Sequence, residues 1–436
     1  MTPLRYRLCL FVLLIVSRPL SARMLSPLSA GDTVAAASLK IALLSDIHYL
    51  SPSLVDQGEA LRVYEHATGR RISDQYKVLD RIWDDLVKEQ PDLLLIAGDL
   101  THHGERQSHL DLVAKLRTLE EQGIRVLVVP GNHDINIPNA RSYRGDKVLP
   151  AESITKEDFA AWYASFGYGD ALQKDDASLS YLAALGEKTW LLCFDSNRYD
   201  EHTGNSVTAG RIRPQTMQWA RSILRDAKEK GITVLGMMHH GLVEHLPYQS
   251  AFFSDYLVEE WEHHAQILAD AGMRLIFTGH FHANDITRYT SPSGNNIYDI
   301  ETASLAQYPF AWRIMTMDGD CLRVDSRFVT SLPDNDHLEE ESRRRLETVG
   351  RRVAEARLKG LGFPLPDELL SVLTDLVVKL YLMHVRGDET PDPELLHAVR
   401  TFASLLGNEA DMSEFSFDFP PEDNRVAIRL KGEGER

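Results

Sequence analysis

The chain has 436 residues, of which 43% are hydrophobic and 25% charged, as in ordinary soluble globular proteins, and this length predicts one large domain with appendages. A formal net charge of −17 argues against a protein that binds nucleic acid by neutralising phosphates. An anionic substrate would need a local source of positive charge, for which bound cations are the obvious choice.

The N-terminal segment is typical of a signal peptide. Arg5 and Arg7 precede an apolar run over residues 8–16 that is too short to span a bilayer. We expect residues 1–30 to be removed and the protein to be exported to a periplasm or beyond, with no membrane-spanning segment left. An uncleaved N-terminal anchor is the alternative.

The first half of the main domain alternates between apolar runs and helical patterns. After a strand ending near residue 44, we expect a polar surface insertion, a helix, a second strand, a second helix and a third strand. These segments cover residues 49–72, 74–89, 93–97, 106–122 and 125–130. The alternation predicts an α/β fold with a mostly parallel sheet covered by helices.

Residues 135–176 interrupt this pattern. A long loop over residues 135–150 and a short helix over residues 155–166 are expected there. An insertion directly after a strand end is a good place for substrate contacts, although a packed surface excursion explains it equally well.

The alternation resumes with two adjacent, antiparallel strands near residues 179–182 and 190–194. Further strands are expected at 234–238 and 275–278, near Ile314 and Val324, and in a hairpin over 285–303. Helices are expected from Pro214 to Gly231 and over 256–271. The main domain then covers residues 38–332.

The C-terminal part has a different character. Helices over residues 336–358, 366–383 and 393–406 form an appendage, assigned to residues 333–407, and Asp336 and Glu339 form a possible capping pair for the first of them. The tail from residue 408 to 436 ends in an apolar alternation that predicts either an edge strand or a disordered segment.

Three cysteines are present, Cys9, Cys193 and Cys321, and only two would remain after signal removal. A disulfide between these two is allowed in an exported protein, and buried free thiols are equally compatible with their apolar surroundings. Neither lies near the candidate site described next, which argues against a cysteine nucleophile.

Five of the apolar strands end in side chains that can bind metals. Ligands bind outside the carboxyl ends of parallel strands, so we expect a single site at a sheet edge. The strand ends carry Asp46 and His48; Asp99; Asn132, His133 and Asp134; His239 and His240; and His280 and His282.

The chemistry of this set predicts two metal ions. On an extended backbone Asp46 and His48 would point to the same side, and Asp99 can bridge two cations with its two oxygens. Two Asp, one Asn and four His without a thiolate suit Mn, Fe or Zn rather than Ca or a structural zinc site. Two such ions, about 3.5 Å apart, clamp a phosphate and activate the water between them.

In their order, the motifs Asp46-Ile47-His48, Gly98-Asp99, Gly131-Asn132-His133-Asp134, His239 and Gly279-His280-Phe281-His282 resemble those of the calcineurin-like metallophosphoesterases. The resemblance covers roughly residues 40–305. It implies a sandwich of two mixed sheets flanked by helices, with a catalytic domain over residues 38–332.

The resemblance also implies roles for individual residues. Asp46, His48, Asp99 and His282 would hold the first metal, and Asp99, Asn132, His239 and His280 the second. His133 would contact the phosphate and stabilise or protonate the leaving oxygen. We therefore expect catalytic roles for His133, Asp99 and Asp134, and substrate contacts from Asn132, His133 and His240.

Several histidines need separate treatment. Gly241 stands where the family usually has a proline, so we take His239 as the ligand, and His240 either supports the ligands or contacts substrate. His102 and His103 are expected at the rim of the site and not among the ligands. His263 and His264 are expected on a solvent-exposed face of a helix.

The motif combination is similar to that of the bacterial phosphodiesterase branch of the family. We therefore expect an exported enzyme that hydrolyses phosphodiester bonds of small substrates through a metal-bridging hydroxide. A phosphomonoesterase or nucleotidase, and a non-catalytic metal-binding partner protein, are the alternatives. Tyr143, Tyr308 and Phe310 could contact the leaving group, or could simply pack in the core. The C-terminal helices could form a lid or a dimer interface, and the sequence leaves the oligomeric state and the native metal pair open.

Overall fold

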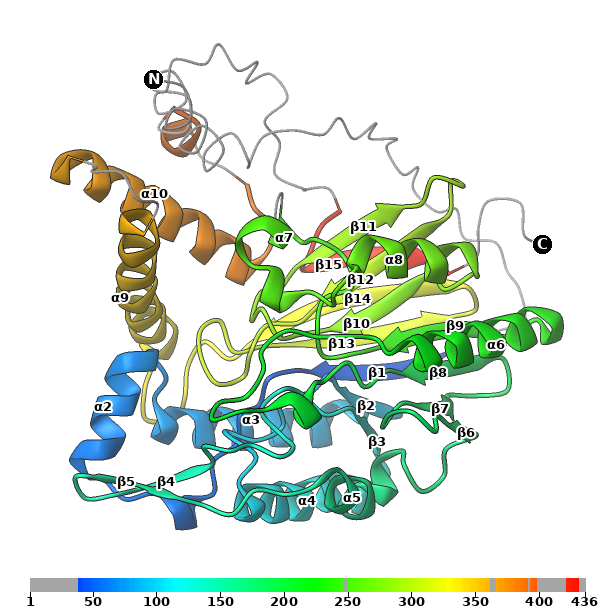
Figure 1. The fold of residues 1–436 in the computed structure, drawn as a ribbon, viewed down its shortest axis with the longest axis horizontal. Helices are drawn as coiled ribbons and strands as arrows, with labels where there is room; N and C mark the ends of the chain where they lie inside the picture. Colours follow the sequence, from blue (N-terminus) through cyan, green and yellow to red (C-terminus); the bar gives the residue numbers. More distant parts are fainter. Residues whose placement is uncertain (1–37, 247–248, 361–365, 391–392, 398–420, 431–436) are drawn as a thin grey trace.

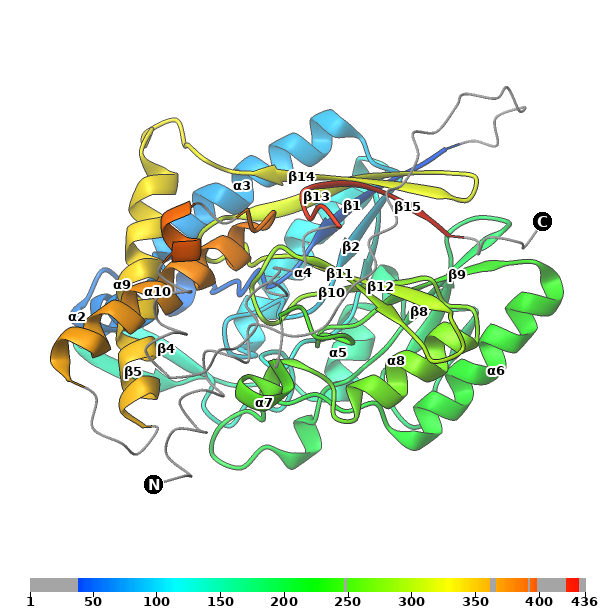
Figure 2. The same cartoon turned by 90° about the horizontal axis from the view of Figure 1, so that it is seen from above.

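The computed structural model describes residues 38–246, 249–360, 366–390, 393–397 and 421–430. The expected signal peptide lies outside these residues. The described chain forms two mixed sheets that face each other, with helices on their outer sides (Figures 1 and 2). The α/β sandwich with a C-terminal helical appendage is therefore confirmed.

The first sheet has six strands in the order β15-β14-β13-β1-β2-β3. Their bounds are β1 Leu39–Leu44, β2 Leu93–Ile96, β3 Arg125–Val128, β13 Ala311–Asp318, β14 Cys321–Phe328 and β15 Arg425–Arg429. Strands β1, β2 and β3 are parallel, whereas β13, β14 and β15 pair antiparallel. The C-terminal alternation thus forms an edge strand of the main sheet.

The second sheet has seven strands in the order β11-β12-β10-β9-β8-β7-β6. Their bounds are β6 Gln173–Lys174, β7 Tyr181–Ala184, β8 Thr189–Cys193, β9 Thr233–Met237, β10 Leu275–Thr278, β11 Ile286–Thr290 and β12 Asn296–Glu301. Strands β8, β9, β10 and β12 are parallel. The predicted antiparallel pair β7–β8 and the hairpin β11–β12 are both confirmed.

Helices cover the outer face of each sheet (Figures 1 and 2). The first sheet is covered by α3 Ile72–Glu89 and α4 Arg106–Glu121, and the second by α6 Pro214–Lys230 and α8 Trp261–Asp270. Strand alternation explains the layering, because successive side chains point to opposite faces. Leu235 of β9 belongs to the same core cluster as Leu43 of β1, whereas Val234 packs with Ile223 of α6.

Two segments, one predicted as a polar surface insertion and one as a long loop, contain regular secondary structure. The insertion over residues 49–72 contains η1 Pro52–Leu54 and α2 Glu59–Thr68, and residues 135–150 contain the hairpin of β4 Arg141–Arg144 and β5 Lys147–Pro150. Leu61 of α2 and Tyr143 of β4 belong to one small buried cluster. The predicted helix over 155–166 is present as α5 Lys156–Trp162, with a capping box between Thr155 and Asp158, followed by η2 Ala164–Phe166.

The C-terminal appendage contains α9 Leu338–Lys359 and α10 Asp367–Arg386, which pack on each other beside α2. The predicted capping pair of Asp336 and Glu339 is wrong, because α9 follows His337 without a side-chain cap. Of the third predicted helix, residues 393–397 are helical and the remainder lies outside the described residues. Among the helices that are described, none has the length and apolar character needed to cross a bilayer.

The remaining short elements connect these layers: η3 Tyr199–Glu201, α7 Gln249–Phe252 and η4 Ser254–Tyr256. The two cysteines of the described chain, Cys193 and Cys321, are free thiols on strands of different sheets, so the interpretation without a disulfide holds.

Candidate dimetal centre

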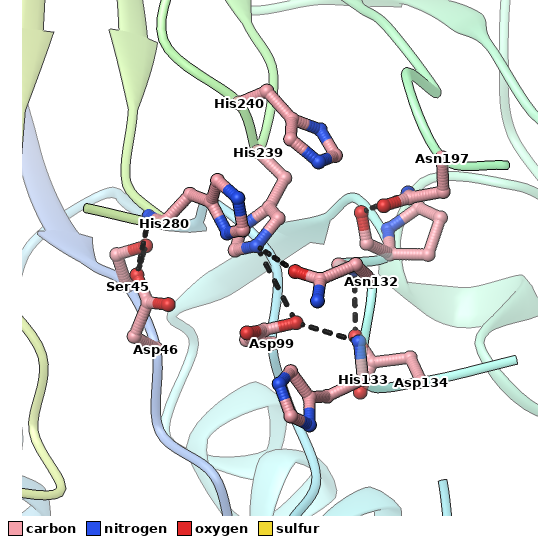
Figure 3. Close-up of polar contacts among 12 residues, drawn as sticks. Ser45, Asp46, Asp99, Asn132, His133, Asp134, Asn197, His239, His240 and His280 are labelled. Carbon is pink, nitrogen blue, oxygen red and sulfur yellow. Dashed lines mark hydrogen bonds and ion pairs between the residues drawn. The ribbon is translucent and has the colours of Figure 1, made fainter. Parts of the chain in front are cut away.

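The predicted metal ligands come together where the two sheets meet. Strands β1, β2 and β3 of the first sheet and β9 and β10 of the second all end there. Figure 3 shows His239 and His280 facing Asp99 and Asn132 across this junction. The sequence suggested one sheet edge, whereas the structure uses one edge from each sheet.

The first ligand cluster consists of Asp46, His48, Asp99 and His282, whose candidate ligand atoms all lie within 4.8 Å of one another. His48 Nε2 is 3.5 Å from Asp99 Oδ2 and 3.2 Å from His282 Nε2. His282 Nε2 is in turn 3.1 Å from Asp46 Oδ1. This cluster is the first-metal set that the family resemblance implied.

The second cluster consists of Asp99, His239 and His280, with the same 4.8 Å limit. His239 Nε2 lies 3.4 Å from Asp99 Oδ1 and 3.0 Å from Asn132 Oδ1. His280 Nε2 is 3.1 Å from the carbonyl oxygen of Asp255, which leaves its Nδ1 for the site. Asp99 is shared by the two clusters, one oxygen toward each.

The donors of the first cluster fit a cation. Asp46 Oδ1 is completely buried and has no hydrogen-bond partner among the described residues, and two imidazole Nε2 atoms approach it. Buried lone pairs that converge in this way are costly unless a positive charge lies between them. A mixed oxygen and nitrogen set of this kind is suited to Mn, Fe or Zn.

Five of the ligands adopt left-handed backbone conformations. Their φ angles are 50° for Asp46, 46° for His48, 47° for Asp99, 74° for His280 and 63° for His282. The expectation that Asp46 and His48 lie on an extended backbone is therefore wrong. The chain turns sharply after each strand and aims the side chains back at the junction, and backbone strain of this kind is concentrated at functional sites.

Two glycines permit the close approach of the site loops. A Cβ on Gly131 would overlap the backbone nitrogen and Oδ1 of Asp99, and a Cβ on Gly279 would overlap Ser45 Oγ and Asp46 Oδ2. In the space left open, Asp46 Oδ2 accepts hydrogen bonds from Ser45 Oγ at 2.6 Å and His280 N at 2.9 Å. Glycine at these positions is thus required by packing.

A family model for calcineurin-like phosphoesterases matches residues 39–284, more than half of the chain. The chain belongs to the calcineurin-like phosphoesterase family. Its ordered motifs, its two mixed sheets and its two buried ligand clusters agree with that membership.

Individual relatives of this calcineurin-like phosphoesterase are distant. A probable cyclic nucleotide phosphodiesterase from Pseudoalteromonas sp. (strain SM9913) is 33% identical over 125 residues, which make up 28% of this chain and 41% of that relative. Among solved structures, a dimetal phosphatase from Danio rerio has 15% identity and a TM-score of 0.48, with 66% of this chain and 96% of that chain covered. A 5'-nucleotidase precursor from Thermus thermophilus has 11% identity and a TM-score of 0.36, with 72% and 59% covered.

His133 lies beside the shared ligand Asp99 of this phosphoesterase. Its backbone N–H donates to Asp99 Oδ1 at 2.9 Å, and its Nδ1 donates to the carbonyl oxygen of His102 at 3.0 Å. The carbonyl can only accept, so the proton on Nδ1 is fixed and Nε2 is the ring atom that can exchange a proton. The ring of His133 lies 5.0 Å from that of His48, centroid to centroid.

The sequence did not identify what holds His133 in place. His102 is buried, so the prediction of a rim position is wrong for it, and His103 Nδ1 lies 3.1 Å from His133 Nδ1. Neither residue belongs to the two ligand clusters that share Asp99. The decisive group is a backbone carbonyl of His102, and sequence patterns carry no signal for such an atom.

Asp134 links two of the site loops. Its carboxylate accepts hydrogen bonds from the backbone nitrogens of Leu100, Thr101 and Gly131 at 3.1, 2.9 and 2.7 Å, and from Thr101 Oγ1 at 2.9 Å. Asp134 is completely buried and both oxygens are used. These contacts suit a role in positioning Asp99 and His133, and the catalytic role of Asp134 stays a prediction.

His240 supports the ligands from behind. Its Nδ1 is hydrogen bonded to Ser196 Oγ and its Nε2 to the carbonyl oxygen of Thr208, both at 2.8 Å, and the side chain is fully buried. Its ring packs 4.4 Å from that of His280. No ring nitrogen remains for a substrate, so the supporting role is the alternative that the geometry favours. Burial lowers the pKa of His240 to about 3, which keeps the ring neutral.

Asn197, which the sequence did not single out, lies beside the same loops (Figure 3). Its side-chain nitrogen donates to the carbonyl oxygen of Pro130 at 2.7 Å, just before Gly131. It follows β8, a strand without a predicted ligand. Its role is to hold the loop that carries Asn132 and His133.

Charges around the site are balanced between histidines and carboxylates. Burial lowers the pKa of His239, but the Asp99 carboxylate outweighs it and raises that pKa to about 9. Metal binding at this cluster is therefore coupled to proton release. Burial first, and then the positive charge of Arg70, hold the pKa of His48 and His102 well below the usual range.

Three aromatic residues considered for substrate contact are buried instead. Tyr143, Tyr308 and Phe310 are 1%, 5% and 2% exposed. Tyr308 packs against the C-terminal helices and Phe310 belongs to the main core. Core packing is therefore the account that holds for them. Both histidines of α8 were predicted to be exposed to solvent. The prediction is correct for His263, which is exposed, and wrong for His264, which is buried.

Proposed function

We propose that this calcineurin-like phosphoesterase hydrolyses phosphodiester bonds of small substrates in an exported compartment, with cyclic nucleotides and glycerophosphodiesters as the first candidates. The observation that carries hydrolysis is the pair of ligand clusters sharing Asp99, with His133 directly beside them. The diester preference is supported by the similarity to a probable cyclic nucleotide phosphodiesterase over 125 residues. Export is supported by the signal-like residues 8–16.

The chain's own residues define the work of the site. Two ions, held by the clusters around Asp99, would polarise phosphoryl oxygens and make water a better nucleophile at neutral pH. Asp99 offers one oxygen to each cluster. In the reaction a bond forms between phosphorus and a water oxygen while the bond to the leaving alkoxide breaks. His133 Nε2 is placed to transfer the proton that the alkoxide needs.

Arg70 supplies a positive charge for an anionic substrate. It is half-buried, and no carboxylate of the described residues forms an ion pair with it. Burial lowers the pKa of His133, Asp99 opposes this, and Arg70 lowers it further, so the guanidinium lies within electrostatic reach of the site. A lowered pKa also makes protonated His133 a stronger acid toward the leaving group.

The test uses metal-stripped protein with Mn, Zn, Fe and Mg added back separately. Hydrolysis of bis(p-nitrophenyl) phosphate and p-nitrophenyl phosphate is compared, followed by a cyclic nucleotide and a glycerophosphodiester. Metal-dependent cleavage that favours the diester supports the proposal. Preference for the monoester identifies a phosphatase or nucleotidase, and no hydrolysis despite bound metal leaves a binding protein; either result refutes the diester assignment.

Matched variants separate chemistry from folding. Asp99→Asn and His133→Ala are expected to lower kcat by about a hundredfold or more, the range for losing a metal bridge or a positioned acid. His337→Ala, a substitution of an exposed histidine, is expected to leave kcat unchanged. Undiminished turnover by either site variant, purified free of wild type, contradicts the assigned roles.

A further inference from the structure

A second group of buried titratable side chains lies apart from the dimetal centre. It contains His245 after β9, Asp285 before β11, Asp299 and Glu301 on β12, His384 in the last turn of α10, and Glu389 just beyond it. All six are buried, with exposed fractions of 7% or less. Buried carboxylates and imidazoles in such number require compensation of charge.

The contacts within this group are short. His245 Nδ1 is 2.6 Å from Asp285 Oδ1, and His384 Nδ1 is 3.3 Å from Asp285 Oδ2 and 2.9 Å from Glu389 Oε1. The candidate ligand atoms of Asp285, His384 and Glu389 all lie within 4.8 Å of one another. The two catalytic clusters meet the same limit.

Hydrogen bonds within the protein satisfy only part of the group. The buried carboxylate of Asp299 has hydrogen-bond partners, because its Oδ2 accepts hydrogen bonds from the backbone nitrogens of Leu242 and Val243 at 2.7 and 3.0 Å. Other atoms are buried and have no hydrogen-bond partner among the described residues. These atoms are Asp285 Oδ2, Glu301 Oε2, Glu389 Oε2, His245 Nε2 and His384 Nε2. Asp285 Oδ2 does lie 3.3 Å from His384 Nδ1, and His245 Nε2 lies 3.3 Å from Asp299 Oδ2 and 3.6 Å from Glu301 Oε2. Glu389 Oε2 and His384 Nε2 have neither a hydrogen bond nor an ion pair among the described residues.

The charge balance also leaves a deficit. Four carboxyl groups face two imidazoles, and with Glu301 and both histidines protonated one negative charge remains unneutralised. The nearby guanidinium of Arg313 donates its hydrogen bonds to the hydroxyls of Thr302 and Ser326 and to the backbone carbonyl oxygens of Glu301 and Asp423. It donates none to the carboxylates of this group. Burial raises the pKa of Glu301 to about 8, so this carboxyl holds a proton at neutral pH and adds no charge to the group.

We propose that Asp285, His384 and Glu389 bind a third cation, a transition-metal ion of the Zn or Mn class, with His245 and Glu301 beside it. Mixed carboxylate and imidazole donors without a thiolate favour ions of this class. The site is distinct from the dimetal centre because it shares no ligand with either catalytic cluster. The inference does not depend on which phosphate ester is the substrate.

The position of this third site gives it a structural role. Asp285 belongs to the edge of the second sheet, whereas His384 and Glu389 lie at the end of α10. The ring of His384 also lies 5.6 Å from that of Phe281, centroid to centroid. Phe281 is the residue between the catalytic ligands His280 and His282 in the sequence. A cation here would fasten the C-terminal helix behind the loop that carries those ligands.

The experiment counts metal ions on the full chain. Protein is stripped, reloaded with Zn or Mn, freed of excess metal and assayed for metal per chain by mass spectrometry. The wild type is expected to hold three equivalents, and Glu389→Gln and His384→Asn two each. Glu368→Gln, an exposed carboxylate on the same helix, is the matched control and should retain three. Two equivalents in the wild type, or a third that persists in both variants, overturns the proposal.

A second measurement covers the case in which a variant folds poorly. In protein carrying Asp46→Asn and His280→Asn, which weaken the catalytic clusters, added Zn should still raise Tm. Adding Glu389→Gln to that background should abolish the rise. If added Zn leaves the Tm of the Asp46→Asn, His280→Asn protein unchanged, the buried group is an ion network that forms without metal. The third site then does not exist.

Discussion

Replacing Asp134 tests whether this residue positions the site or takes part in catalysis. Its carboxylate accepts three backbone N–H groups and one hydroxyl, and so ties the loop after β2 to the loop after β3. In Asp134→Asn the amide oxygen can keep the bonds from Leu100 and Gly131. The amide nitrogen then faces the N–H of Thr101, and two donors meet in a fully buried place.

The magnitude follows from the bonds that are lost. One buried backbone N–H without a partner costs about 1–3 kcal/mol, and the loss of charge on the remaining acceptor adds to this, so we expect Asp134→Asn to lower the free energy of unfolding by about 2–3 kcal/mol. Asp134→Ala strands all three N–H groups and should cost about 4 kcal/mol or more. Turnover should fall with the misplacement of Asp99 and His133 in both variants.

Urea unfolding gives the stability and ester hydrolysis gives kcat and KM for each variant. Asp80→Asn, at a carboxylate on α3 that is 67% exposed and paired with Lys115, is the matched control and should change stability by less than about 0.5 kcal/mol. A positioning role for Asp134 is contradicted if Asp134→Asn unfolds like the wild type yet loses turnover by a factor of about a thousand. That result would mean that Asp134 touches the reacting groups.

Three other changes have definite expected outcomes. Burial raises the pKa of Glu105 to about 7, so the folded protein holds a proton that the unfolded chain releases near pH 4.5. In urea unfolding at a series of pH values, Glu105→Gln should therefore have the same free energy of unfolding as the wild type at pH 4. At pH 8 its free energy of unfolding should be higher than that of the wild type by about 3 kcal/mol. Equal pH profiles would contradict this. Gly279→Ala should lower metal content and activity together, because its Cβ would overlap Ser45 and Asp46; unchanged metal content in a metal assay would argue against the packing account. Arg70→Ala should raise KM by about tenfold and change kcat little, as expected for the loss of one charge-assisted contact with the substrate. Steady-state kinetics measure both constants. An unchanged KM would mean that Arg70 does not contact the substrate.

The sequence was informative wherever an apolar strand ran directly into a ligand residue. All five strand ends were placed, because each apolar run is followed within a few residues by Gly, Asp or His. The sequence was less informative over residues 49–72, which were predicted only as a polar surface insertion. They contain α2, which Gly58 and Gly69 cap. Strand β5 is exposed along its length, so it has no apolar alternation to reveal it.

The parts of the site that the sequence could not give are those made by backbone and by long-range packing. The left-handed turns at Asp46 and His48 aim the ligands. Asp and His adopt positive φ more often than other non-glycine residues, but the residue type alone does not say at which positions they do so. The carbonyl of His102 orients His133 without any dependence on its own side chain. Asp285 and Glu389 meet only because α10 folds back onto the second sheet, and no local pattern records that contact.

Because each ligand cluster draws residues from both sheets, neither sheet by itself contains a complete metal site. Asp46, His48 and Asp99 are synthesised early, but the first cluster is finished only by His282 and the second only by His239 and His280. Each cluster is therefore complete only after the two halves of the chain have joined, so occupied catalytic metal sites would report that joining. A product truncated before residue 239 would lack His239, His280 and His282 and could complete neither cluster.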